Sequence, residues 1–225
     1  MQKKFRQRFS FALLCIFFSS AFALAEETTN NELITAVVAG QHSRVVELLK
    51  QGANPNAKQK LTGWTAISVA SYYGYPDIVK DLVHAGADVN VRDVRQNTPL
   101  MRAVTLGPYE NLEEHLTRKV EVTKILLESG ANPYMTNSFG EPTWRIPEID
   151  HHDSLAAVFE NAGIAETDEV ELMEAIARND LVAVRAALAN DIDLNFHDAY
   201  GWTFLKQAEA VKNPQIKKLL LSAKK

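Results

Sequence analysis

The sequence predicts an all-α solenoid of about six stacked helix pairs, joined by short β-hairpin-like fingers. The tripeptide Gly-Ala-Asn/Asp follows three apolar helical runs and begins at residues 52, 86 and 130. A second phrase, in which Thr opens an apolar run that ends in Ala, alternates with it at residues 63–70, 97–103 and 201–208. Such a spacing is typical of stacked repeats. The hydrophobic share of 46% is enough for a core and argues against disorder.

The residue types within each repeat justify two short helices and a finger. Thr opens the first helix, where its hydroxyl can accept hydrogen bonds from free N–H groups, and Pro99 suits the first turn. Small residues such as Ala70 and Ala103 let helices approach closely, and Gly74 suits the turn between them. The Gly of each tripeptide ends the second helix, where a left-handed residue is favoured. The Asn- and Asp-rich residues that follow are expected to form the fingers.

Two of the repeats depart from the pattern. Unit three carries an insertion of 11 residues at 108–118, which we expect in the turn between its helices, as a tolerated surface elaboration or a contact loop. Unit four is degenerate, because Pro147 stands where other units have Ala, so its first helix should be short or distorted. A short connection then predicts a seam near 164–169, between four units and two.

The two alternating phrases resemble those of the ankyrin repeat, which combines Thr-Pro-Leu-His-x-Ala with a downstream Gly-Ala-Asp-x-Asn. The resemblance covers residues 31–225, although Ser68, Met101 and Lys206 replace the His of the motif. It implies an ankyrin-repeat solenoid of about six repeats, the fourth degenerate. It also implies that the chain binds a protein through its finger tips and the inner helices of its concave face.

The first 25 residues have the pattern of a secretory signal peptide. A basic start precedes the apolar residues 11–25, which end in Ala23-Leu24-Ala25 before two acidic residues. We therefore expect cleavage after Ala25, a repeat domain over 26–225, and a periplasmic or otherwise secreted protein that does not contact a membrane. A retained membrane anchor is the alternative, since 17 uncharged residues lie at the lower limit of a bilayer span.

Charge and motifs argue against several function classes. Residues 26–225 contain 20 basic and 28 acidic side chains, a net charge of −8 that disfavours nucleic acid as a partner. The mature chain has no Cys, since Cys15 lies in the signal segment. The dense cluster His151-His152-Asp153 lacks further ligands at recognisable spacing and is expected to be a surface turn. We therefore expect no metal, no cofactor and no enzymatic activity. The alternative is an enzyme with an active site at the seam, which would need His and carboxylate side chains that converge there.

The resemblance places the partner-binding positions around the Thr phrase and on the second half of the first helix. Trp, Tyr and Arg are the residues that most often carry binding energy at interfaces. The alternative for the aromatic residues is packing against a neighbouring repeat. The predicted partner-binding residues are Trp64, Tyr72, Tyr73, Arg95, Asn97, Leu106 and Phe139.

Together, the sequence and the resemblance predict a monomeric protein-binding module that presents a rigid surface after export. One candidate function is that of an accessory scaffold for a resident periplasmic enzyme. The alternative is an immunity protein that inhibits a toxin in the periplasm, because the acidic body suits a basic target.

Overall fold

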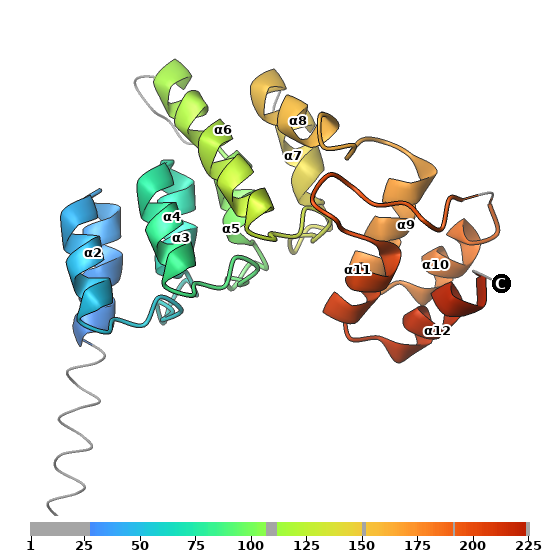
Figure 1. The fold of residues 1–225 in the computed structure, drawn as a ribbon, viewed down its shortest axis with the longest axis horizontal. Helices are drawn as coiled ribbons and strands as arrows, with labels where there is room; N and C mark the ends of the chain where they lie inside the picture. The colour runs from blue at the N-terminus through green and yellow to red at the C-terminus, as the bar shows by residue number, and fades with distance from the viewer. Residues whose placement is uncertain (1–27, 107–111, 150–151, 191, 224–225) are drawn as a thin grey trace, which may run out of the picture.

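The computed structural model describes residues 28–106, 112–149, 152–190 and 192–223, which form an arc of helix pairs (Figure 1). Residues 28–38 form the first described helix. The elements that follow are α2 (His42–Lys50), α3 (Ala66–Tyr73), α4 (Pro76–His84), α5 (Pro99–Val104), α6 (Leu112–Glu128), the 3-10 helix η1 (Thr143–Arg145), α7 (Ile146–Ile149), α8 (Asp153–Glu160), α9 (Asp168–Ala177), α10 (Leu181–Ala187), α11 (Phe204–Ala210) and α12 (Pro214–Ala223). The all-α solenoid is thereby confirmed. Within these ranges the fingers are hydrogen-bonded turns, with a single isolated β-bridge between Thr136 and Pro142.

The Thr of the repeated phrase begins the first helix of the regular units. Thr98 accepts a hydrogen bond from the N–H of Met101, with Pro99 as the first helical residue, and Thr203 caps α11 in the same way. Thr65 precedes α3, but its hydroxyl contacts Ser68 Oγ at 3.1 Å instead of a backbone N–H. The predicted capping is confirmed at α5 and α11 and is wrong at α3, where a neighbouring hydroxyl competes.

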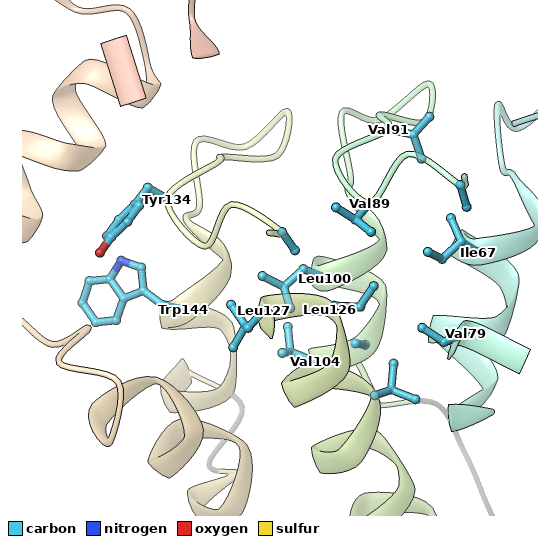
Figure 2. Packing of buried hydrophobic residues seen from close by; sticks show 14 of the residues in the cluster. Ile67, Val79, Val89, Val91, Leu100, Val104, Leu126, Leu127, Tyr134 and Trp144 are labelled. Atoms are coloured by element: carbon cyan, nitrogen blue, oxygen red, sulfur yellow. The ribbon is translucent and has the colours of Figure 1, made fainter. Parts of the chain in front are cut away.

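The core runs continuously between the stacked helices. First helices pack on first helices, as α3 does on α5, and second helices pack on second helices, as α4 does on α6. Aliphatic side chains such as Ile67, Val79, Leu100 and Leu126 fill the space between them, and Tyr134 and Trp144 continue the core toward unit four (Figure 2). Each of the first three units therefore buries its apolar face largely against its neighbours, as in a solenoid.

Asparagine side chains join consecutive fingers. The Asn56 amide donates to the Gly86 carbonyl at 2.9 Å and accepts from the Asp88 N–H at 2.7 Å. One repeat later, Asn90 donates to Gly130 at 3.1 Å and accepts from Asn132 at 2.8 Å. We call this pair of repeated bridges the asparagine ladder. It explains why Asn recurs four residues after Gly52 and Gly86, since the amide satisfies a helix-terminal carbonyl and a finger N–H together.

The insertion in unit three lengthens a helix. α6 has 17 residues against 9 for α4, and residues 112–118 of the predicted insertion form its N-terminal part. Figure 1 shows α6 extending beyond α4, its neighbour in the stack. Unit four begins with η1 and the four-residue α7, which contains Pro147, so the prediction of a short first helix is confirmed.

Units five and six pack on the rest of the chain through buried polar contacts. The Tyr134 hydroxyl donates to Asp198 at 2.9 Å, and the Asn132 amide donates to Gln207 at 2.7 Å. The Trp144 indole N–H donates to Glu174 at 2.9 Å. Helices pair again from α9 to α11 and from α10 to α12. The seam near 164–169 remains a prediction, although the connection from α8 to α9 lies there.

Several predictions lie outside the described residues. These are the signal segment 1–25 with its cleavage site after Ala25, residues 108–111 of the predicted insertion, and His151 of the His-His-Asp cluster. His152 is described and directly precedes α8. Among the described helices, none is long and apolar enough to cross a membrane.

Candidate functional site

Four aromatic side chains form a row along α3. Trp64 precedes the helix, Tyr72 and Tyr73 end it, and Tyr75 follows. Ring centroids are 5.5 Å apart for Trp64 and Tyr72, 5.4 Å for Tyr72 and Tyr73, and 5.7 Å for Tyr73 and Tyr75. These are favourable edge-to-face and stacked distances. We call these four residues the aromatic row. Each is half-buried, so one part of the side chain packs while another meets solvent.

Two tight turns fix the Tyr75 end of the row. Gly74 ends α3 with a left-handed φ of +67°, which brings Tyr75 back toward Tyr73. A Cβ at Gly40, which has a φ of +64°, would stand 3.1 Å from the Tyr75 hydroxyl oxygen. A side chain at this position would strain the backbone and crowd the Tyr75 hydroxyl, so glycine favours the approach. The row is thus anchored on the turn of unit one.

Arg102 connects the row to the finger of unit three. Its guanidinium lies 4.2 Å from the centroid of the Trp64 ring, a favourable cation–π distance, and pairs with the Asp93 carboxylate. Asp93 is buried, and its other oxygen accepts the N–H groups of Arg95 and Asn97 at 2.8 and 2.9 Å. One carboxylate therefore holds both the shape of the finger and the cation that covers Trp64.

Lys119 of α6 supports the row from inside the protein. The side chain is fully buried, and Nζ lies 5.2 Å from the centroid of Tyr72. Nζ donates to the carbonyl oxygens of Ser71, Arg102 and Thr105 at 3.1, 2.6 and 2.9 Å. Those carbonyls lie at or beside the C-terminal ends of α3 and α5, where intrahelical donors run out. Burial, and then the charge of Arg102, lower the pKa of Lys119 to about 7.

His115 lies one turn before Lys119 on the lengthened helix and is also buried. Burial, followed by the charges of Lys119 and Arg118, lowers the pKa of His115 to about 4. The folded protein therefore holds this imidazole neutral near pH 7. Its ring and the stem of Lys119 pack against the Gly74 turn, so the lengthened part of α6 supports the end of the row.

Three fingertips carry large apolar side chains at the same position, four residues before Thr65, Thr98 and Thr143. The exposed fraction is 91% for Leu61, 65% for Val94 and 80% for Phe139. We call Leu61, Val94 and Phe139 the fingertip ridge. Backbone hydrogen bonds join neighbouring tips, from Val94 to Thr62 at 3.2 Å and from Ser138 to Arg95 at 3.1 Å. The ridge is therefore one connected edge.

The structure divides the predicted binding residues into separate groups. Trp64, Tyr72 and Tyr73 are in contact in the aromatic row, whereas Arg95 and Phe139 are exposed on adjoining fingertips. The remaining two are half-buried: Asn97 closes its finger through backbone hydrogen bonds to Asp93, and Leu106 packs against the core. A role in partner binding remains a prediction for all seven. The packing alternative holds in part for the aromatic residues, since each of them is half-buried.

Sequence reasoning missed Tyr75, Arg102 and Lys119. Lys119 had a detectable signal, because it shares a helical face with the apolar positions 122 and 126 and therefore faces the core. Arg102 and Tyr75 had none, since their partners Asp93, Trp64 and Gly40 come from other turns or other units.

In the part of the chain that the structure describes, no three His, Cys, Asp or Glu side chains are grouped as metal ligands. Two basic side chains lie over rings of the aromatic row, Arg102 and Lys119, and both are engaged in hydrogen bonds. The row therefore offers half-buried rings in a fixed arrangement. Such a surface suits non-covalent contact.

A comparison with protein families supports the repeat assignment. Residues 33–137 match the family model described as ankyrin repeats in three copies. The matched stretch includes the aromatic row and all three residues that support it, Arg102, Asp93 and Lys119.

Curated relatives resemble parts of the chain. It is 38% identical over 76 residues to ankyrin repeat and SOCS box protein 6 of Homo sapiens, covering 33% of this chain and 18% of that protein. It is 29% identical over 118 residues to a putative ankyrin repeat-containing protein of Treponema pallidum, covering 52% and 36%. A third match, glycerophosphocholine phosphodiesterase gde1 of Schizosaccharomyces pombe, is 37% identical over 98 residues, covering 44% and 8%. The chain thus spans well under two thirds of these relatives.

Proposed function

Since residues 33–137 of this chain are ankyrin repeats, which are protein–protein interaction modules, we propose that the chain binds a protein partner through the aromatic row. The binding is non-enzymatic in this proposal. The match to the phosphodiesterase covers 8% of that protein and lies within the repeats of this chain.

The observation that carries the proposal is the immobilisation of the row. Three ring pairs, the Arg102 guanidinium and the Lys119 ammonium hold Trp64, Tyr72 and Tyr73 in place. Aromatic residues that are already ordered lose little conformational freedom on binding, so more of the contact energy appears as affinity. Their partial exposure leaves part of each ring for a partner.

The test uses the triple variant Trp64→Ala/Tyr72→Ala/Tyr73→Ala beside the wild-type chain in affinity capture from a periplasmic extract. A specific protein should be retained by the wild type and lost by the variant, while circular dichroism shows that both are helical. The single variant Val182→Ala is the control, because Val182 is 78% exposed on α10, away from the row. Equal retention by the triple variant would contradict the proposal.

Export to the periplasm is part of the proposal and rests on residues 1–25. Intact-mass measurement of the chain purified from the cell envelope tests it. Cleavage after Ala25 predicts a mature chain that begins at Glu26. An uncleaved chain in the membrane fraction would instead support a retained anchor.

Within this function we favour an accessory scaffold for a resident periplasmic enzyme. The alternative of an immunity protein draws on the net charge of −8 over residues 26–225, which suits a basic toxin. The identity of the captured protein separates the two. A resident enzyme supports the scaffold, and a toxin whose activity the chain abolishes supports the alternative.

A further inference from the structure

Exposed apolar side chains are concentrated on the fingertip ridge. The large hydrophobic residues that are exposed in the described ranges are Val38, Leu61, Val94, Phe139, Val182 and Leu221. Half of these form the ridge, at one equivalent position in three successive fingers. Such clustering is typical of an interaction surface, whereas single exposed hydrophobic residues need no explanation.

The first two fingers surround the ridge with positive charge. Lys58 is exposed in the first finger, where Nζ donates to the backbone carbonyl of Arg92, and Arg95 is exposed beside Val94. Arg92 is half-buried, and its guanidinium donates to the side-chain oxygen of Gln96. Among the described residues, no carboxylate forms an ion pair with any of these three cations.

The acidic residues of the second finger are engaged in holding its shape. Asp93 is buried against Arg102. Asp88 accepts the N–H of Asn90 at 2.9 Å, and its own N–H is bound by Asn56, at the far end of the finger from Val94. The charge that these fingers present outward around Leu61 and Val94 is therefore positive.

The acidic side chains of units one to three lie elsewhere. Several of those on the helices form ion pairs with basic neighbours, as Glu32 and Glu47 do with Arg44, and Glu121 with Lys80.

The net negative charge of the chain consequently does not describe the Leu61 and Val94 tips of the ridge. At the third tip the exposed Glu141 accepts a hydrogen bond from the Asn137 amide, so the positive charge belongs to the first two tips. A local positive field beside apolar tips attracts acidic segments, whereas the negative charge of the whole chain favours basic ones.

We infer that the fingertip ridge docks a segment of the partner protein in which acidic side chains alternate with bulky apolar ones. The apolar side chains cover Leu61, Val94 and Phe139, while the carboxylates lie against Lys58, Arg92 and Arg95. Three cations among apolar tips favour a peptide over nucleic acid, whose binding depends on many phosphate contacts. This inference rests on the proposed function and adds the chemistry of the partner.

The experiment selects binders from a random peptide library displayed on phage, with the full chain as bait. The enriched peptides should combine Asp or Glu with large apolar residues. The strongest of them is then synthesised and titrated against variants. Val94→Ser and Arg95→Glu should each weaken its binding at least tenfold, and exchange of its acidic residues for Lys should restore binding to Arg95→Glu.

The chain offers a matched control for each variant. Val182→Ser makes the same change at an exposed valine of α10, and Arg185→Glu makes the same charge reversal at an exposed arginine of that helix. Neither lies on the ridge, so both should bind the peptide like the wild type. Equal weakening by a variant and its control would point to a non-specific effect of polarity or charge and would overturn the inference.

The outcomes also separate this inference from the proposed function. Enriched peptides that lack acidic residues, or that bind Arg95→Glu as tightly as the wild type, overturn the inference. If such peptides still lose binding to Trp64→Ala/Tyr72→Ala/Tyr73→Ala, the proposed function stands without it. Failure to enrich any peptide that depends on the ridge or the row counts against both.

Discussion

The N-terminal stack of units one to three and the C-terminal section of units five and six are held to their neighbours in different ways. In the N-terminal stack, Asn56 and Asn90 repeat the same bridges from finger to finger. At the next equivalent position the chain has Tyr134, whose hydroxyl instead donates to Asp198. The ladder therefore ends where the chain turns to a buried polar contact with another unit.

The difference teaches how a repeat protein can be regular in one part and specialised in another. A ladder of identical bonds places each finger by the same rule, so the spacing of the units follows from the repeated sequence, whereas the aromatic row on α3 also needs Arg102 and Lys119 of unit three. Buried polar groups such as the Trp144 indole N–H and the Glu174 carboxylate must instead all find hydrogen-bond partners to be tolerated. The proposed function places binding in the N-terminal stack, and we propose that the C-terminal section closes the array.

The largest effect is expected from Trp144→Ala, which breaks the contact between unit four and the C-terminal section. The indole is almost fully buried, so its loss should lower the free energy of unfolding by about 3 to 5 kcal/mol. Urea denaturation measures this. Trp144→Phe keeps most of the ring volume but removes the N–H that Glu174 accepts, and it should cost less. An unchanged midpoint for Trp144→Ala would show that units four and five do not depend on this contact.

Lys119→Met tests how the N-terminal stack supports the aromatic row. The three carbonyl groups that Lys119 binds would lose their donor, so we expect destabilisation of about 3 kcal/mol. Lys124→Met is the matched control, because Lys124 is exposed on the same helix. Thermal denaturation followed by circular dichroism compares them. Similar melting temperatures for both variants would mean that the buried ammonium contributes nothing.

Asn90→Ala removes one bridge of the ladder. It leaves the Gly130 carbonyl and the Asn132 N–H without their partner, at a cost of about 1 to 3 kcal/mol. Asn195 occupies the corresponding position in unit five, but its described hydrogen bond is made by its backbone, so Asn195→Ala should have little effect. Equal effects in urea denaturation would contradict the role of the ladder.

The effect of pH is a change in stability between two conditions and arises in the N-terminal stack. His115 has a pKa of about 4 in the folded chain against 6.5 for an unperturbed His. The unfolded state therefore binds the extra proton between these values, and stability falls as the pH drops through this window. His115→Leu does not titrate, so its stability should fall less between pH 7 and 4.5. Parallel losses measured by urea denaturation would show that His115 is not the source.

The sequence predicts the regular elements better than the site. The glycine and asparagine phrases predict the helix pairs and fingers, because their hydrogen bonds are local or join equivalent positions. Pro147 likewise predicts the short α7 from its own chemistry. Lys119 and Arg102 could not be placed in the same way, since Lys119 binds Ser71, 48 residues away, through a helix that the insertion lengthens. Because Tyr134 stands where the ladder would need an asparagine, the sequence shows where the ladder stops. It does not identify Asp198 as the partner of Tyr134.

The assignment of binding to one region and closure to the other is tested most directly by one pair of affinities. The partner's dissociation constant is measured by calorimetry for Trp64→Ala/Tyr72→Ala/Tyr73→Ala and for Tyr134→Phe. The second variant removes the hydroxyl that donates a hydrogen bond to Asp198. We expect the triple variant to lose binding while it remains folded, and Tyr134→Phe to be less stable but to bind like the wild type. Retained binding by the folded triple variant, or loss of binding by a folded Tyr134→Phe, would contradict the assignment.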